Sequence, residues 1–85
     1  MQITVKVFVT LRKYLDSKWS QKPEFQVSWE DLPGDPKRIH HLIDYLKLPE
    51  QDIGQIILNG HIKWDRTIEL HPNDRVILQP PIGGG

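Results

Sequence analysis

The sequence contains no cysteine, and this absence removes several kinds of chemistry together. The chain can form no disulfide, no thiolate metal site and no cysteine nucleophile, a composition that suits a reducing compartment. Its 11 basic and 11 acidic residues cancel without a long run of either sign, so a broad nucleic-acid-binding surface is not expected. No apolar run approaches a membrane span, and the first residues lack the pattern of a signal peptide. We therefore expect one small cytoplasmic domain of 85 residues, without nucleic acid or membrane partners.

Alternating apolar residues predict the strands of a sheet. The apolar positions of the first two strands are Ile3, Val5, Val7 and Val9, then Phe25, Val27 and Trp29. Two further strands, 55–59 and 61–64, flank Asn59-Gly60, which is the strongest hairpin signal in the sequence. The last strand is expected at 75–79. Residues 10–15 are predicted to form a short helical turn, and residues 16–23 a loop.

One segment carries the pattern of a helix. Asp35 is predicted as its N-cap and Pro36 as its first residue, and Pro49 is expected to end it. The apolar residues repeat at helical spacing and form one stripe: Ile39, Leu42, Ile43 and Leu46. One helix on one face of a mixed sheet is an α+β two-layer fold. Such a sheet becomes compact when the first and last strands pair in parallel.

The chain resembles a known family over essentially its whole length. The element order looks like the β-grasp, or ubiquitin-like, fold. Within it, the chain resembles the sulfur-carrier branch that holds the small subunit of molybdopterin synthase and the thiamin sulfur carrier. Besides the opening strand, four stretches carry the match: TLRKYL at 10–15, ILNG at 57–60, LHPNDRV at 70–76 and PPIGGG at 80–85. The Pro-Pro step looks more like the molybdopterin branch. Two positions depart from the pattern: Gln79 stands where that branch often has an aromatic residue, and Pro-Asn-Asp replaces a Gly-Asp turn at 72–74.

The resemblance implies a covalent role for the C-terminal glycine. In this family a ubiquitin-activating-type enzyme uses ATP and magnesium to adenylate the terminal carboxylate, and sulfur then replaces AMP to give a thiocarboxylate. The modified residue would be Gly85, with Gly83 and Gly84 in a channel of the partner. The chain itself would bind no cofactor or metal and would supply no catalytic residue. Glycines without side chains fit a narrow channel, whereas Pro80 and Pro81 fix φ and stiffen the exit from the sheet.

A partner must also bind the body of the domain. Ordering a glycine tail costs about 1 to 2 kcal/mol per residue, so docking has to be driven by an apolar surface beside the last strand. If Val76 and Leu78 face the helix, Ile77 faces outward. The interface residues expected from this alternation and from the resemblance are Phe8, Arg12, Ile62, Ile77, Gln79, Pro80, Pro81 and Ile82. Two of these residues have an alternative interpretation. Phe8 could be an ordinary aromatic residue that is exposed or covered by a loop, and Arg12 could form a surface salt bridge.

The remaining motifs give weaker signals. His40 and His41 are adjacent on the helix and point about 100° apart, so the pair is not expected to chelate one metal ion. His61 and His71 lie far off in sequence, without partners at ligand spacing. Trp29 falls on the buried alternation of its strand, and no basic groove accompanies the tryptophans as nucleic-acid binding requires.

Three functions remain in view. The first is a sulfur carrier for molybdopterin, its tungsten equivalent, thiamin or another acceptor, with an adenylating enzyme and the molybdopterin synthase large subunit as partners. The second is a ubiquitin-type modifier joined through Gly85 to a target lysine. The third is an interaction module whose glycines are incidental. The first two share their activation chemistry, so the tail does not separate them. We expect a β-grasp domain at 1–79 and a flexible tail ending in Gly-Gly at 80–85.

Overall fold

The computed structural model describes residues 1–81. In chain order its elements, with η for a 3-10 helix, are β1 (Gln2–Val7), η1 (Val9–Tyr14), α1 (Ser17–Ser20), β2 (Glu24–Ser28), η2 (Trp29–Asp31), α2 (Ile39–Tyr45), η3 (Glu50–Asp52), β3 (Ile56–Leu58), β4 (His61–Lys63) and β5 (Arg75–Leu78).

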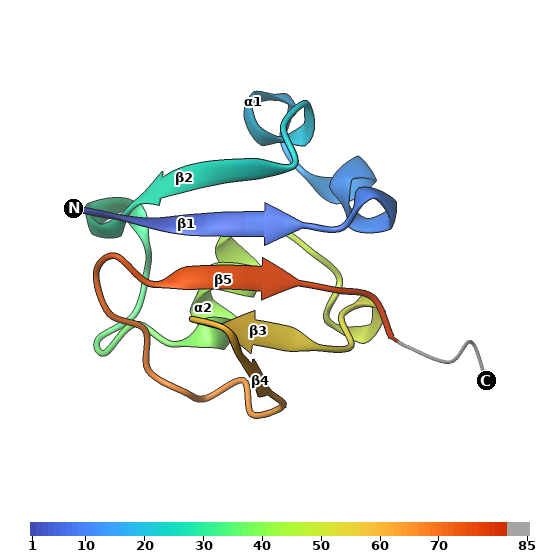
Figure 1. Ribbon diagram of the computed structural model, residues 1–85. Helices are drawn as coiled ribbons and strands as arrows, with labels where there is room; N and C mark the ends of the chain where they lie inside the picture. The colour runs from blue at the N-terminus through green and yellow to red at the C-terminus, as the bar shows by residue number, and fades with distance from the viewer. Residues whose placement is uncertain (82–85) are drawn as a thin grey trace.

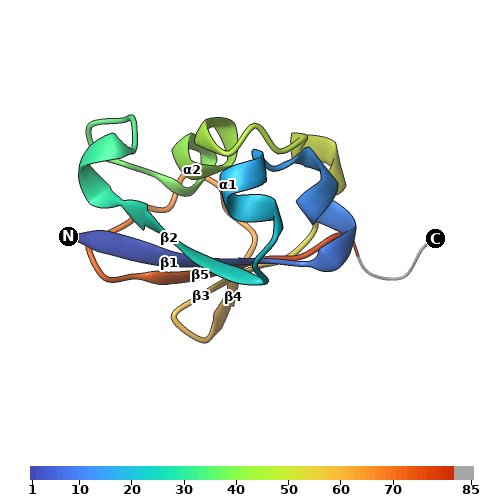
Figure 2. The ribbon, with the colours of Figure 1, turned by 90° about the horizontal axis from the view of Figure 1, so that it is seen from above.

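The strands form one mixed sheet in the order β2-β1-β5-β3-β4 (Figure 1). β1 and β5 pair in parallel, with Val5 opposite Val76, and all the other neighbouring strands pair antiparallel. The parallel pairing of first and last strands expected for compactness is thereby confirmed. The helices lie on one side of the sheet and leave its other face open (Figure 2). This is the predicted α+β arrangement, a mixed sheet packed on one main helix, as in the β-grasp.

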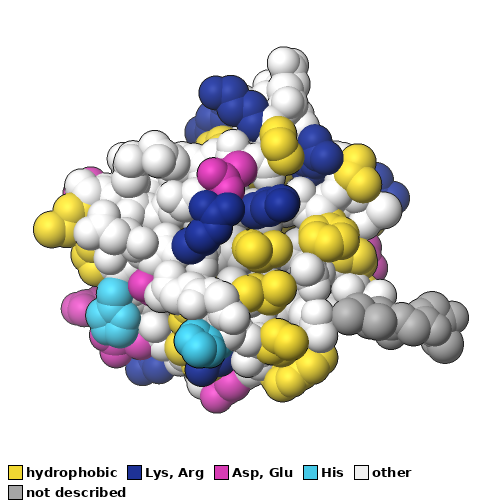
Figure 3. Space-filling view, in the orientation of Figure 1, with side chains coloured by type: hydrophobic (Ala, Val, Ile, Leu, Met, Phe, Trp, Pro, Cys, Tyr) yellow, Lys and Arg dark blue, Asp and Glu magenta, His cyan; other side chains and the backbone are white. Residues whose placement is uncertain are grey.

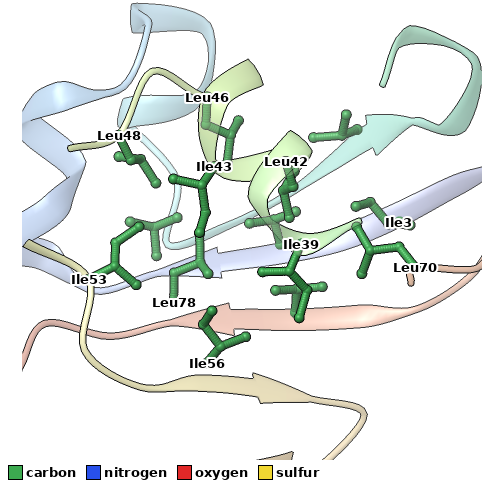
Figure 4. Close-up of a cluster of buried hydrophobic side chains, with 14 of the residues drawn as sticks. Ile3, Ile39, Leu42, Ile43, Leu46, Leu48, Ile53, Ile56, Leu70 and Leu78 are labelled. Atoms are coloured by element: carbon green, nitrogen blue, oxygen red, sulfur yellow. The ribbon is translucent and has the colours of Figure 1, made fainter. Parts of the chain in front are cut away.

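The core lies between α2 and the inner face of the sheet (Figure 4). The predicted helical stripe is fully buried, as are the inward residues of β1 and β5: Ile39, Leu42, Ile43, Leu46, Ile3, Val5, Val7, Val76 and Leu78. Each such side chain stabilises the fold by about 1.5 to 3 kcal/mol relative to an exposed position. A slip of one residue in any strand would expose this set, so the core fixes which side chains face outward.

The first two strands are shorter than predicted. β1 ends at Val7, and Val9 is 67% exposed, so its assignment to the buried face is wrong. The chain turns at Phe8 into η1, and Leu11 there takes a buried position. The helical turn predicted at 10–15 is confirmed. Trp29 begins η2 after β2 has ended, and it is only partly buried against the core.

The start of α2 also differs from the prediction. Arg38 is the N-cap, in an extended conformation, so the assignment of Asp35 and Pro36 to the helix start is wrong. The N–H groups of residues 39 and 40 donate to backbone oxygens within 66–68, at 3.0 and 2.9 Å. Because this distant segment satisfies the first helical donors, an aspartate cap three residues upstream is not needed.

Three smaller features complete the comparison. The predicted loop at 16–23 contains α1, where the Asp16 carboxylate accepts the Lys18 N–H at 3.1 Å. α2 ends at Tyr45, ahead of Pro49. The predicted hairpin at Asn59-Gly60 is confirmed, with φ angles of 51° and 86°. Both angles are positive, as a type I′ turn requires.

Candidate functional site: an outer apolar face beside the tail root

The open face of the sheet carries a row of isoleucines from three adjacent strands. Ile77 of β5 lies beside Ile57 of β3, which lies beside Ile62 of β4. The residues that flank Ile77 in β5, Val76 and Leu78, are buried, so the alternation turns Ile77 outward as predicted. Ile62 is 54% exposed, and the other two isoleucines are partly exposed. An apolar row of this kind, on the face of the sheet that no helix covers, is a candidate interface.

A second outward-facing row lies two residues farther along the chain than Ile77, at Gln79, just past the end of β5. The Phe8 N–H donates to the Leu78 oxygen at 3.2 Å, and the Gln79 N–H donates to the Gln55 oxygen at 3.0 Å. Gln55 lines a hollow together with Trp64, which follows β4. Phe8 and Trp64 are 41% and 65% exposed. The two rows together form the outer apolar face, defined as Phe8, Ile57, Ile62, Trp64 and Ile77. Hydrophobic side chains gather on this side of the molecule toward the end of β5 (Figure 3).

The tail root, residues 79–81, borders this face. The Gln79 oxygen accepts the Gly54 N–H at 2.8 Å, so both backbone groups of Gln79 are bonded to residues 54–55. Pro80 and Pro81 have no N–H groups and cannot donate to a further strand pair. The two prolines therefore end the strand-pairing hydrogen bonds just beyond β5.

Two hollows flank the tail root. The first is lined by Gly54, Gln55, Trp64 and Pro81. The second lies on the other side, between η1 and η3, and its lining residues are Thr10, Leu11, Lys13, Tyr14, Asp52, Pro80 and Pro81.

Tyr14 and Asp52 tie η1 to η3 at the edge of the second hollow. The Tyr14 hydroxyl donates to Asp52 Oδ2 at 2.7 Å. This hydrogen bond, with a smaller contribution from burial, raises the pKa of the Tyr14 phenol above its ordinary value.

Arg12 lies in η1 and is partly buried. Its Nε atom is buried and has no hydrogen-bond partner within residues 1–81. In the same range its guanidinium forms no ion pair, so the salt-bridge alternative is not seen there.

Of the eight predicted interface residues, Arg12 lies apart from the outer apolar face, in η1. Six lie together on or beside the outer apolar face and the tail root: Phe8, Ile62, Ile77, Gln79, Pro80 and Pro81. Ile82, Gly83, Gly84 and Gly85 lie outside the described residues. The sequence reasoning missed three residues at this site: Gly54, Ile57 and Trp64. No local signal marked Ile57, because three successive apolar residues at 56–58 predict burial on both faces of the strand.

His40 and His41 were expected to point about 100° apart on the helix, but their rings lie close together. The rings of His40 and His41 lie 4.1 Å apart between centroids. His41 Nδ1 accepts the Arg38 N–H at 2.9 Å and so acts as part of the helix cap. Within residues 1–81 no group of three or more His, Asp or Glu side chains is arranged to hold a metal ion. No helix in that part of the chain is both long and apolar enough to cross a membrane.

No protein-family model matches this sequence, and no curated protein sequence matches it significantly. Solved structures do match it. A chain in the complex of subunits 1 and 2 of the molybdopterin-converting factor from Helicobacter pylori 26695 has a TM-score of 0.59 and 20% identity, over 100% of both chains. SAMP1 from Haloferax volcanii has a TM-score of 0.60 and 18% identity, also over 100% of both chains.

A third match is the small archaeal modifier protein 1 of Methanosarcina acetivorans. Its TM-score is 0.61 and its identity 19%, over 99% of this chain and 96% of that one. At such identities the likeness establishes the fold. The chain has the ubiquitin-like β-grasp fold that the sequence resemblance implied.

Proposed function

We propose that this chain is a sulfur carrier whose Gly85 carboxylate is adenylated and converted to a thiocarboxylate, and that it serves molybdopterin biosynthesis. The observation that carries the proposal is the arrangement at one end of the sheet. There the outer apolar face adjoins the tail root, as a protein that delivers its C-terminus to partners requires. The likeness to a chain of a molybdopterin-converting factor complex supports the choice of pathway.

The proposed chemistry uses the α-carboxylate as the reacting group. It is ionised at neutral pH, because an α-carboxyl group in a peptide has a pKa of about 3.3 to 3.7. One carboxylate oxygen attacks the α-phosphorus of ATP, and pyrophosphate leaves. Sulfide then attacks the carbonyl carbon of the acyl adenylate, and AMP leaves with the electron pair of the broken C–O bond. Without adenylation the carboxylate has no adequate leaving group. ATP and magnesium are bound by the activating enzyme, and side chains of this protein take no part in either step.

Two partners are proposed for the same surface: the ubiquitin-activating-type enzyme and the large subunit of molybdopterin synthase. Phe8 and Trp64 give the outer apolar face aromatic side chains, which are enriched at the core of protein interfaces. The isoleucine row supplies apolar area that docking removes from water. Arg12 lies in η1, between Leu11 and Lys13, which line the hollow next to Pro80 and Pro81, and we keep it as a proposed partner contact.

A ubiquitin-like protein modifier is the second candidate. The observation that favours it is the likeness to SAMP1 structures, one of which is named a small archaeal modifier protein. In this case a lysine amine replaces sulfide as the nucleophile that attacks the adenylated Gly85.

Intact-mass spectrometry tests the proposal. With the adenylating enzyme, ATP, magnesium and sulfide, the chain should gain about 16 Da as one carboxylate oxygen becomes sulfur. A chain that lacks Gly84 and Gly85 should melt as the parent does and gain nothing. The parent without the enzyme should also gain nothing.

The two candidates separate in cells. A sulfur carrier should leave no lysine joined through an isopeptide bond to Gly85, and deletion of its gene should abolish molybdopterin. Lysine conjugates with normal molybdopterin, or mass gain without the enzyme, would contradict the sulfur-carrier proposal.

A further inference from the structure

Gly54 lies against the backbone of the tail root. A Cβ atom built on Gly54 would lie 2.4 Å from Pro81 Cα, 2.7 Å from Pro81 N and 2.9 Å from the Pro80 carbonyl carbon. All three are backbone atoms, so no rotamer change can make room. The chain would have to take a different path.

The conformation of Gly54 does not itself require glycine. The glycines with positive φ within residues 1–81 are Gly34 and Gly60, and Gly54 is not among them. Glycine is therefore needed at position 54 for the contact with Pro80 and Pro81, and not for a left-handed turn.

Gly54 is also held in place. Ile53 before it is buried in the core, and its oxygen accepts the Arg66 Nη2–H at 2.8 Å. The Gly54 N–H donates to the Gln79 oxygen, and Gln55 accepts from the Gln79 N–H. Gly54 and Gln79, the first residue of the tail root, are thus both held by hydrogen bonds at the end of the sheet.

We propose that Gly54 is a positioning residue for C-terminal activation: its bare Cα and its N–H set the direction in which the chain leaves the sheet at Gln79, Pro80 and Pro81. This inference rests on the proposed function, because it concerns delivery of the Gly85 carboxylate to ATP. The four residues after Pro81 span at most about 14 Å when extended, so a displaced root cannot be fully offset by a longer reach.

The test compares Gly54→Ala with Gly60→Ala. Gly60 has φ 86°, and a Cβ there meets nothing within 4 Å, so its alanine variant is strained but leaves the tail root untouched. Gly60 lies in the β3–β4 turn, at the opposite end of β3 from Gly54. The control therefore carries a stability loss without the clash.

With the adenylating enzyme, Gly54→Ala should lower kcat for ATP–pyrophosphate exchange about 10- to 100-fold. Its KM should stay within about threefold of the parent value, because the outer apolar face is intact. Gly60→Ala should keep the parent kcat at temperatures where it is folded. Gln79→Pro is a second variant, since it deletes the N–H that bonds Gln55 and leaves Gly54 in place. It should lower kcat in the same way.

Amide hydrogen exchange gives a readout that does not need activation. In Gly54→Ala the Gln79 amide should lose protection while core amides such as that of Leu42 keep theirs. Parent-like kcat and Gln79 protection in Gly54→Ala would overturn the inference, as would an equal loss of kcat in Gly60→Ala. If no adenylating enzyme activates the parent, the proposed function fails. Protection at Gln79 alone then decides whether Gly54 holds the tail root.

Discussion

Ile56 and Ile57 offer a matched test of the two faces of β3, because the same side chain is removed at adjacent positions. Ile56 is 0% exposed and belongs to the core, whereas Ile57 stands in the outer isoleucine row. Ile56→Ala should lower the free energy of unfolding by about 2 to 5 kcal/mol, since it leaves a cavity beneath α2. That is a large share of the roughly 4 to 13 kcal/mol expected for a domain of this length. Ile57→Ala removes two cross-strand contacts, to Ile62 and Ile77, and should cost about 1 kcal/mol.

Thermal melts followed by tryptophan fluorescence measure the first difference. The Tm of Ile56→Ala should fall by about 10 °C or more, and that of Ile57→Ala by no more than about 8 °C. Partner binding measured by calorimetry should show the reverse order. Ile57→Ala should weaken binding about 5- to 30-fold, whereas Ile56→Ala should bind as the parent does while it is folded. Equal losses of stability, or unchanged binding by Ile57→Ala, would refute the assignment of the two faces.

Two further predictions concern neighbouring parts of the site. Val7→Asp should unfold the domain because it buries an unpaired charge, whereas Phe8→Asp should stay folded and bind the partner more weakly. If urea titrations showed that Val7→Asp and Phe8→Asp destabilise the domain equally, the assignment of Val7 to the core and of Phe8 to the surface would be wrong. The hydrogen bond to Asp52 raises the pKa of Tyr14 above its ordinary value of 10.0. The stability that this bond contributes should therefore be complete below that ordinary value, and it should be lost as pH rises through the raised pKa. Asp52→Ala should return the tyrosinate absorbance titration toward that ordinary value, and an unchanged titration would argue against the bond.

The inner face of the fold could be predicted because local periodicity determines it. The spacing of Ile39, Leu42 and Ile43 is enough to identify one face of a helix, whatever lies opposite. Ile57 was harder to assign, since a run of three apolar residues predicts burial on both faces. Its outward position follows only when the registers with Ile62 and Ile77 are known.

The parts that could not be predicted depend on contacts between distant segments. The N-terminus of α2 is satisfied by backbone oxygens within 66–68, so no residue near Asp35 signals where the helix begins. Gly54 carries no local signal either, because its φ is ordinary and its requirement is a contact with Pro81. Tertiary structure decides both positions, and a single sequence contains no pattern for either.

The strand order links the outer apolar face to the tail. β5 is the central strand, between β1 and β3, so the chain leaves the sheet from the middle of its end and not from a side. Phe8 of the β1 side and Trp64 of the β4 side therefore lie on opposite flanks of the tail root. A partner that covers the isoleucine row must also cover the point of exit, since Ile77 is only two residues from Gln79 in the same chain. Had the last strand been an edge strand, docking on the face and capture of the C-terminus would be separate events. With β5 in the centre, one surface includes both the outer apolar face and the tail root, which is the arrangement that the proposed activation of Gly85 requires.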